Sequence, residues 1–304
     1  MFEVQGDYYP SRHLMTITAK GMARGTIAFD GPLGRRTVAR PESGRFEGAR
    51  ISGEILCHLA NEWRTESPFQ EGLSQIEGLI ALQSDEGRTI FMKYIGRRSA
   101  RYGETSWRLG VGFEADREGP DWLNELHAAA TVEQVGDDLV FTVHELVRAD
   151  APDAEHFFRI TPLYQMIARD SVGKRHMIDG QVARRYFSVA ERGCRANGLV
   201  DAEWVEGFSW GSHRMGTVAG RMPMHIDMRA AMVTDDGVPI IQHYTGVSQS
   251  ELMSTEPGAD RSWRTTAVFE TAASGAYAWL NGVVAIGLGW AADNEAQYRY
   301  YIME

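Results

Sequence analysis

The amino-acid sequence contains an internal repeat. Residues 74–98 align with residues 224–248 without a gap when Gly87 is matched with Gly237, an offset of 237 − 87 = 150. A second block follows in the same order, with matches at offsets of 156 and 157. The matched residues are Ile76 and Ile226, Glu77 and Asp227, Asp85 and Asp235, Ile90 and Ile240, Tyr94 and Tyr244, Gly96 and Gly246, Trp107-Arg108 and Trp263-Arg264, Phe113-Glu114 and Phe269-Glu270, and Trp122-Leu123-Asn124 and Trp279-Leu280-Asn281. Ordered blocks with matched tryptophans indicate a tandem duplication, so the chain is expected to fold into two copies of one domain.

The joint between the copies is expected in the polar stretch 148–156 (RADAPDAEH), which contains Pro152 and three acidic residues. We predict a first domain over residues 1–150, the more diverged copy, and a second over residues 151–304. Each is long enough to bury its own hydrophobic core.

The local sequence pattern of both copies is that of β-structure. The triplets at 85–87 and 235–237 end in glycine, which supplies the positive φ of a tight hairpin turn. Apolar and polar residues alternate with period 2 over 222–233, which predicts a strand with one apolar face. Helical periodicity is scarce. The sequence therefore predicts an all-β fold of two similar antiparallel β-barrels in tandem, forming an internal pseudo-dimer.

Composition narrows the partners and the compartment. The formal charge is 31 − 41 = −10, which argues against nucleic acid, because such proteins normally present a basic face. The two cysteines, Cys57 and Cys194, fit a reducing compartment. No signal-peptide pattern opens the chain. The apolar stretch 276–292 is too short and glycine-rich for a membrane helix and favours a buried strand. We expect a soluble cytoplasmic protein without a membrane partner.

The second copy resembles the bacterial β-barrel family labelled domain of unknown function 3237. The resemblance rests on Asp227, Arg229, Thr234, Asp235, Asp236, Gly237, Gly246, Arg264, Phe269, Glu270, Tyr277, Trp279, Leu280 and Asn281. The first copy departs from the pattern at Glu77, Leu79 and Ser84. The resemblance implies one β-barrel per copy. It implies little about a reaction, because fold alone does not give function.

One strand carries a candidate acid–base pair. His225, Asp227 and Arg229 follow one another at i, i+2 spacing and so share a face. The carboxylate of Asp227 could transfer a proton while Arg229 holds a carboxylate or enolate oxygen. The alternative is a solvated face whose charges pair across strands. The methionines of the opposite face belong to a core or line an apolar lumen.

The candidate site is placed in the second copy because Leu79, the equivalent of Arg229, cannot bind an anion. Glu270 is the candidate second carboxylate. The first copy contains an equivalent pair, Arg108 and Glu114, at the same spacing as Arg264 and Glu270. A purely structural role for these residues is therefore also open.

Aromatic and amide side chains could complete a substrate site. Tyr244, Tyr277 and Trp279 could form its wall, with His225 as a further contact, although core packing explains aromatic residues as well. Asn281 follows Trp-Leu in the second copy as Asn124 does in the first. A buried amide of this kind either secures a loop or donates to a ligand oxygen.

No metal ion and no cofactor are expected. Four histidines lack the spacing of metal ligands: His58, His213, His225 and His243. The glycine pairs at 110–112 and 287–289 lack the βαβ surroundings of a dinucleotide site. Cys194 stands between cations, but a loop cysteine of this kind is usually incidental.

These observations predict a cofactor-independent lyase or isomerase, a cyclase or dehydratase included, acting on a small hydrophobic oxygenated metabolite. The catalytic residues would be Asp227, Arg229 and Glu270. The alternative is a non-catalytic β-barrel that binds an apolar small molecule or a protein partner. A homo-oligomer is possible in either case.

Overall fold

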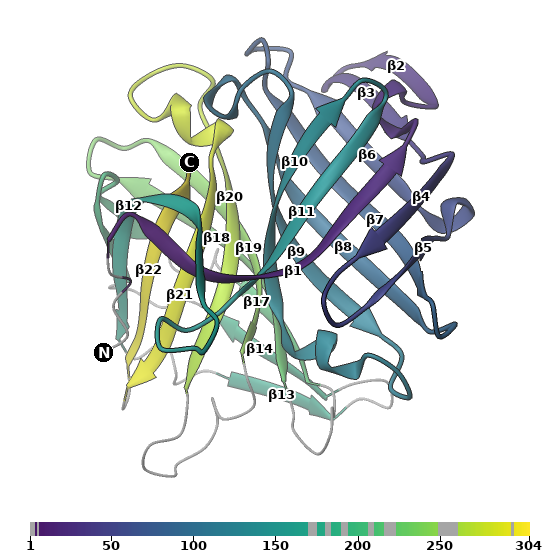
Figure 1. The fold of residues 1–304 in the computed structure, drawn as a ribbon. Coiled ribbons are helices and arrows are strands. Elements are labelled where there is room, and N and C mark those ends of the chain that lie inside the picture. Colours follow the sequence, from purple (N-terminus) through teal and green to yellow (C-terminus); the bar gives the residue numbers. More distant parts are fainter. Residues whose placement is uncertain are drawn as a thin grey trace. The chain divides into compact units, whose positions relative to one another are not determined.

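The computed structural model describes residues 4, 6–169, 175–179, 184–189, 194–205, 210–215, 223–248, 261–292 and 295–304. The chain divides into two compact units, Met1–Ile160 together with Glu304, and Thr161–Met303. Figure 1 shows the strands of the first unit in purple, blue and teal, and most of those of the second in green to yellow.

The first unit contains eleven whole strands and four short 3-10 helices among its described residues. The strands are β1 (Tyr8–Lys20), β2 (Ile27–Gly31), β3 (Gly34–Ala39), β4 (Ser43–Glu47), β5 (Ser52–Ile55), β6 (Asn61–Glu66), β7 (Ser74–Ser84), β8 (Thr89–Arg98), β9 (Ser106–Ala115), β10 (His127–Val135) and β11 (Asp138–Leu146). The 3-10 helices are η1 (Met22–Arg24), η2 (Cys57–Leu59), η3 (Ala100–Tyr102) and η4 (Asp121–Glu125).

The described part of the second unit repeats this order. Its strands are β12 (Glu155–Arg169), which begins in the first unit, β13 (Arg175–Asp179), β14 (Arg184–Val189), β15 (Arg195–Gly198), β16 (Ala202–Trp204), β17 (Trp210–Met215), β18 (Met224–Thr234), β19 (Pro239–Ser248), β20 (Ser262–Thr271), β21 (Val284–Ala292) and β22 (Glu295–Met303). One 3-10 helix, η5 (Ala278–Gly282), precedes β21. The apolar stretch 276–292 is thus mostly η5 and β21, which confirms the predicted buried strand.

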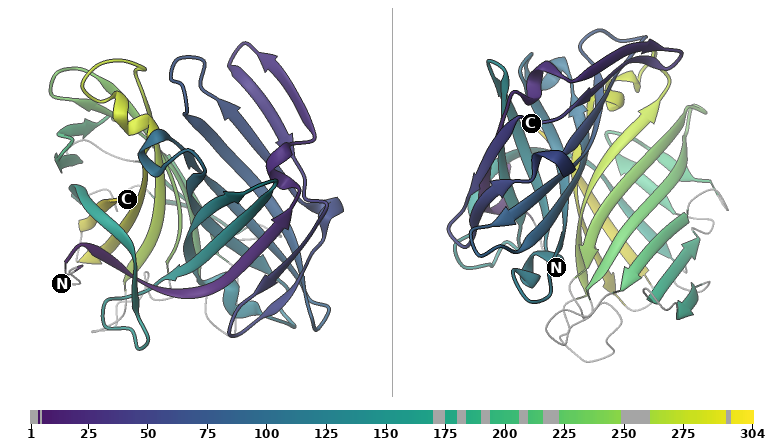
Figure 2. Two further views of the ribbon diagram at one scale, coloured as in Figure 1. Left: turned by 45° about the horizontal axis from the view of Figure 1, so that its top comes forward. Right: turned by 90° about the vertical axis from the view of Figure 1, so that its right-hand side faces the viewer.

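In each unit, eight strands pair in a closed ring. The first ring runs β1–β11–β10–β9–β8–β7–β5–β4 and returns to β1. The second runs β12–β15–β16–β18–β19–β20–β21–β22 and returns to β12. The remaining strands extend each ring sideways, as β6–β3–β2 and β17–β14–β13. Figure 2 shows the same strands from two further directions. The predicted all-β fold of tandem antiparallel barrels is confirmed.

The tight turns lie where the sequence predicts them. Gly87 and Gly237 have φ angles of 80° and 83°, a backbone conformation that glycine adopts without steric cost. Each turn is secured by an equivalent ion pair across strands. Arg45 contacts Asp85 at 3.2 Å and Arg195 contacts Asp235 at 2.6 Å, both at an offset of 150. The repeat thus preserves turn chemistry as well as core residues.

The period-2 pattern of β18 separates an inner from an outer face. Its even-numbered residues, from Met224 to Thr234, are buried, whereas the odd-numbered residues between them are half-buried. The buried methionines belong to the core of the second unit, together with Trp263 and Phe269. The side chain of Asp227 therefore lies on the outside of the barrel wall.

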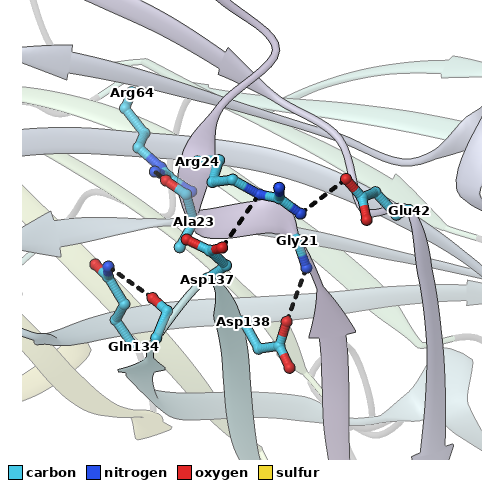
Figure 3. Close-up of polar contacts among 9 residues, drawn as sticks. Gly21, Ala23, Arg24, Glu42, Arg64, Gln134, Asp137 and Asp138 are labelled. Atoms are coloured by element: carbon cyan, nitrogen blue, oxygen red, sulfur yellow. Dashed lines mark hydrogen bonds and ion pairs between the residues drawn. The ribbon is translucent and has the colours of Figure 1, made fainter.

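Part of the first barrel's own chain packs into its core. Met22 of η1 is fully buried among the core residues. Arg64 of β6 donates to the backbone carbonyls of Met22 and Ala23 at 2.9 and 3.0 Å. Figure 3 shows the surrounding polar contacts. These join Gly21 N to Asp138 Oδ1 at 2.9 Å, Arg24 to Glu42 at 2.9 Å and Arg24 to Asp137 at 3.4 Å.

Among the described residues, no helix is long and apolar enough to cross a bilayer.

Candidate functional site

The predicted acid–base pair forms a small ionic cluster on the outer face of the second barrel. Arg229 Nη1 donates to Asp227 Oδ1 at 2.7 Å, and His243 Nε2 lies 3.0 Å from the same oxygen. His243 comes from β19, where it stands opposite Arg229 in the register. The side chains of Asp227 and Arg229 are 49% and 43% exposed, so this cluster lies open to solvent.

The electrostatics of the cluster keep the carboxylate ionised. The hydrogen bond from His243 lowers the pKa of Asp227, and the charges of His243 and Arg229 add to this against an opposing effect of partial burial. A carboxylate with a lowered pKa, held between an arginine and a histidine, is a weak base. From the sequence, His243 is considered only as a possible metal ligand. The residue order of one strand does not show which residues of the next strand stand opposite it.

The second predicted carboxylate lies further round the wall. Glu270 is exposed on β20 and stands opposite Ile241 in the register, whereas Asp227 stands opposite Thr245. The described contacts of the Asp227 carboxylate come from Arg229 and His243. His225 shares the outer face of β18 with Asp227.

Asn281 secures the chain between β20 and η5. Its side-chain oxygen accepts from the backbone N–H of Thr271 at 2.9 Å, and its amide nitrogen donates to the carbonyls of Ala272 and Ala278 at 3.3 and 3.1 Å. The first unit repeats the device: Asn124 accepts from and donates to the backbone of residue 115 at 2.8 and 3.0 Å. Of the two roles open from the sequence, the geometry favours that of securing a loop.

The predicted aromatic wall is divided between two places. Tyr244 points into the core and is 3% exposed. Tyr277 directly precedes η5 and Trp279 lies within it, and both pack partly buried against the core. Desolvation, together with the carboxylates of the neighbouring β18–β19 turn, raises the pKa of Tyr277. The predicted residues therefore do not converge on one point: they lie on the outer wall, in the core and beside η5.

A second polar cluster lies inside the second barrel. It consists of four side chains on four strands, Tyr164 of β12, Gln242 of β19, Thr265 of β20 and Tyr300 of β22. All four are at most 4% exposed. The hydroxyls of Tyr164, Thr265 and Tyr300 and both polar atoms of the Gln242 amide lack a hydrogen bond of normal geometry. We call these four residues the interior polar cluster.

The members of the interior polar cluster are neighbours. The rings of Tyr164 and Tyr300 lie 5.1 Å apart between centroids. Gln242 lies close enough to both hydroxyls to lower the pKa of each tyrosine, but burial outweighs this and raises both pKa values well above the ordinary range. The two hydroxyls are thus protonated at neutral pH and act as hydrogen-bond donors.

The first barrel has apolar residues at all four equivalent positions. The equivalents are Met92 for Gln242 (offset 150), Leu109 for Thr265 (offset 156), Val143 for Tyr300 (offset 157) and Met15 for Tyr164. The last equivalence follows from strand pairing. Phe46 and Ala196 are 150 residues apart, and they pair with Ile17 and Met166, respectively. Met15 and Tyr164 each lie two residues before these partners. The four apolar residues are fully buried. The cluster is therefore an asymmetry between the copies rather than a feature of the shared scaffold.

The surroundings of the interior polar cluster are aromatic and less bulky than in the first barrel. Tyr298 stacks parallel to Tyr300 with centroids 6.4 Å apart, and Trp263 meets Tyr298 edge-on at 5.2 Å. Four core positions change from a larger residue to alanine: Phe46 to Ala196, Ile80 to Ala230, Val111 to Ala267 and Leu139 to Ala296. The two cluster tyrosines offset part of the volume lost.

The buried ion pair of the first barrel, Glu62 and Arg64, is by contrast completed by hydrogen bonds. Glu62 is fully buried, and its carboxylate accepts from Arg64 Nε at 2.6 Å and from the Tyr94 hydroxyl at 2.8 Å. The Nη1 and Nη2 groups of Arg64 donate to backbone carbonyls of η1. This network has the form of an ion pair completed by hydrogen bonds, as buried charges require.

Within the described part of the chain, no three His, Cys, Asp or Glu side chains group closely enough to hold a metal ion. The side chain of His213 lies outside the described residues. Cys194 is buried in the core of the second unit.

The fold and the interior polar cluster define a class: a tandem pair of eight-stranded antiparallel β-barrels whose second member has a polar interior. The family described as "Protein of unknown function (DUF3237)" matches the chain twice, over residues 11–146 and 152–303. The chain belongs to this family, as a tandem duplication, and the resemblance found in the sequence is confirmed.

Three solved structures are similar to the chain. A conserved protein of unknown function from Rhodopseudomonas palustris shares 20% identity over 45% of this chain and 97% of its own, with a TM-score of 0.40. A β-barrel-like protein from Acinetobacter baumannii shares 19% identity over 48% and 100%, also at 0.40. A protein with unknown function from Clostridium acetobutylicum shares 15% over 45% and 99%, at 0.39. No curated protein matches the chain.

Proposed function

We propose that the second barrel binds a small, uncharged, largely apolar molecule that carries an oxygen acceptor. The observation that supports this is the interior polar cluster, whose buried polar atoms make no hydrogen bond of normal geometry within the protein. Leaving a buried donor or acceptor unsatisfied costs about 1–3 kcal/mol per group. A bound molecule that supplies the missing hydrogen bonds recovers part of that cost, and the apolar core around the cluster would hold the rest of the molecule.

The chemistry of the cluster sets the class of ligand. The protonated hydroxyls of Tyr164 and Tyr300 donate to a carbonyl or ether oxygen, and the amide of Gln242 can both donate and accept. The cluster has no ionised member, so it offers a charged ligand no counter-charge, and burying an unpaired charge is costly. The proposed ligand is therefore neutral, such as an aryl ketone.

Binding rather than catalysis is proposed because the two kinds of group do not meet. An acid–base reaction needs a base beside the reacting carbon. Asp227, the predicted base, lies on the outer face of β18, whereas the interior polar cluster lies on the inner faces of the strands. A lyase or isomerase that uses Asp227 remains a second hypothesis, supported by the contact between Asp227 and His243.

Thermal unfolding of the full-length protein with three matched probes tests the proposal. Acetophenone has an aromatic body and a carbonyl, ethylbenzene has a similar shape without oxygen, and benzoate carries a charge. We expect acetophenone to raise the Tm most, with an affinity at least about fivefold above that of ethylbenzene, since one satisfied hydrogen bond contributes about 1 kcal/mol or more. Benzoate should leave the Tm unchanged.

Variants locate the binding. The double variant Gln242→Met and Thr265→Leu restores the residues of the first barrel and should abolish the acetophenone shift. The matched control is Ile241→Met, next to Gln242 but exposed on the outer face, which should retain it. Equal shifts in the double variant and the unaltered protein would show that the ligand binds elsewhere.

A further inference from the structure

The lateral extension of the first barrel ends in an unusually apolar edge. Among the described strands, β2 pairs with β3 alone, so the other side of β2 is an open sheet edge. Figures 1 and 2 show the purple β2–β3 hairpin at the end of the first unit's extension. Four of the five residues of β2 are exposed, with Ile27 at 58% and Phe29 at 49%.

Exposed apolar side chains concentrate on this extension. Twelve large apolar residues of the described chain are exposed, and five of them lie on β2, the β2–β3 turn, β6 and the loop after β6. These five are Ile27, Phe29, Leu33, Trp63 and Phe69. Such concentrations on a protein surface mark interaction sites more often than single exposed residues do.

Strand pairing places several of these side chains on one face. Ile27 stands opposite Val38, and Val38 stands opposite Trp63. Trp63 points outward because its neighbours Glu62 and Arg64 point into the barrel. Phe29, two residues from Ile27, shares that face. An open edge and an apolar face thus occur together, without the lysine, proline or bulge that usually blocks edge pairing.

We infer that β2 pairs antiparallel with β2 of a second copy of this chain, about a two-fold axis at Phe29. Residues paired in this arrangement have numbers that sum to 58, so Phe29 stands opposite Phe29 of the other copy and Ala28 opposite Asp30. The two phenylalanines form an aromatic cross-strand pair, which stabilises antiparallel sheets. The two-fold arrangement makes the contact self-complementary and closed.

The charges of the strand favour this register. Asp30 is the one charged residue of β2, and it is paired within its own copy with Arg35 at 3.4 Å. Centring the pair on Phe29 places Asp30 opposite alanine rather than opposite its symmetry mate. A register centred on Asp30 would bring two carboxylates together, which destabilises a strand pair. The dimer would join two three-stranded extensions into one six-stranded sheet.

Engineered disulfides test both the contact and its register. In a Cys57→Ser background of the full-length protein, Phe29→Cys places two thiols directly opposite each other. Cross-strand Cα atoms lie about 4.5–5.5 Å apart, within the range that a disulfide spans. The matched control is Ile27→Cys, whose two copies are displaced by four residues along the strands, about 13 Å. We expect oxidised dimer from the Phe29 variant and little from the Ile27 variant.

Sedimentation velocity over a hundredfold range of concentration provides the second measurement. The unaltered protein should dimerise as concentration rises, and Phe29→Lys should shift the midpoint to at least tenfold higher concentration. The exposed control Phe69→Lys, outside β2, should have a much smaller effect. A protein that stays monomeric throughout, a dimer insensitive to Phe29→Lys, or equal cross-linking of both cysteine variants would overturn the inference.

Discussion

At the scale of single residues, two polar clusters of the second barrel have opposite environments. Asp227, Arg229 and His243 satisfy one another on a half-exposed wall. The interior polar cluster is buried, and its polar atoms make no hydrogen bond of normal geometry. Ordinary structural side chains are satisfied when buried, so the unsatisfied cluster is the stronger indication of function. The ligand-free protein bears the free-energy cost of buried polar groups without good hydrogen bonds. A ligand that supplies those hydrogen bonds removes part of this cost.

The stability of the ligand-free protein should therefore rise when the cluster is removed. The double variant Gln242→Met and Thr265→Leu replaces unsatisfied groups with the apolar residues of the first barrel. We expect the free energy of unfolding of the second unit's transition to increase by about 1–3 kcal/mol, measured by urea denaturation without ligand. A decrease of similar size would mean that these groups already have good partners in the free protein.

The ionic cluster on the outer wall should contribute little. Because the side chains of Asp227 and Arg229 are about half exposed, Asp227→Asn should change the free energy of unfolding by less than about 1 kcal/mol. Because the pKa of Asp227 is lowered in the folded protein, its carboxylate stabilises the fold at pH values above its ordinary pKa. This contribution to stability is lost as pH falls through the lowered value.

Asp227→Asn should also leave acetophenone binding unchanged, with Glu77→Gln as the matched control. A tenfold loss of any turnover on a cognate substrate in the Asp227 variant alone would favour the lyase or isomerase hypothesis.

At the scale of elements, the strands follow the sequence pattern closely, whereas contacts between strands do not. The hairpin turns at Gly87 and Gly237 and the two faces of β18 follow from local residue order, because turn chemistry and period-2 alternation are local properties. The pairing of Asp227 with His243 and the encounter of Tyr164 with Gln242 depend on register and barrel closure. The open edge at β2 has the same origin, since only the pairing pattern shows which strand is last.

One element junction of the first unit should make the protein sensitive to acid. His144 of β11 is 2% exposed and stacks on Phe157 with centroids 3.9 Å apart. Burial, together with the neighbouring His13, lowers the pKa of His144 from 6.5 to about 4. Glu155 lies 4.0 Å away but is 55% exposed and screened by water. Between these two pKa values, the unfolded chain binds a proton that the folded chain does not.

Stability should accordingly be constant above about pH 6.5 and fall as pH decreases toward 4, by about 3 kcal/mol from this residue. Urea denaturation at a series of pH values measures this. His144→Phe should flatten the profile in that window, whereas His58→Gln, on η2, should not. A profile identical in all three proteins would show that another group controls the acid response.

At the scale of the whole molecule, duplication explains both what the sequence predicts and what it does not. The repeat, the glycine turns and the family pattern determine the all-β tandem fold. The interior polar cluster does not stand out in the sequence, because its four residues are uncharged and come from four separate strands. A comparison of inward-facing positions between the copies would have found Gln242 against Met92 and Thr265 against Leu109. The account that results assigns different interiors to the two barrels: apolar residues fill the positions of the first barrel that correspond to the interior polar cluster, and the second barrel's interior is proposed to bind a ligand.

The most direct test of that division is NMR of the full-length protein with 13C-labelled methionine methyl groups, titrated with acetophenone. Methionines line the cores of both barrels, so they report from each separately. We predict saturable shifts for Met228 and Met232 of the second barrel and none for Met15 and Met92 of the first. Shifts confined to the first barrel, or no saturable shift in either, would contradict the claim that the second barrel's interior binds a small neutral molecule.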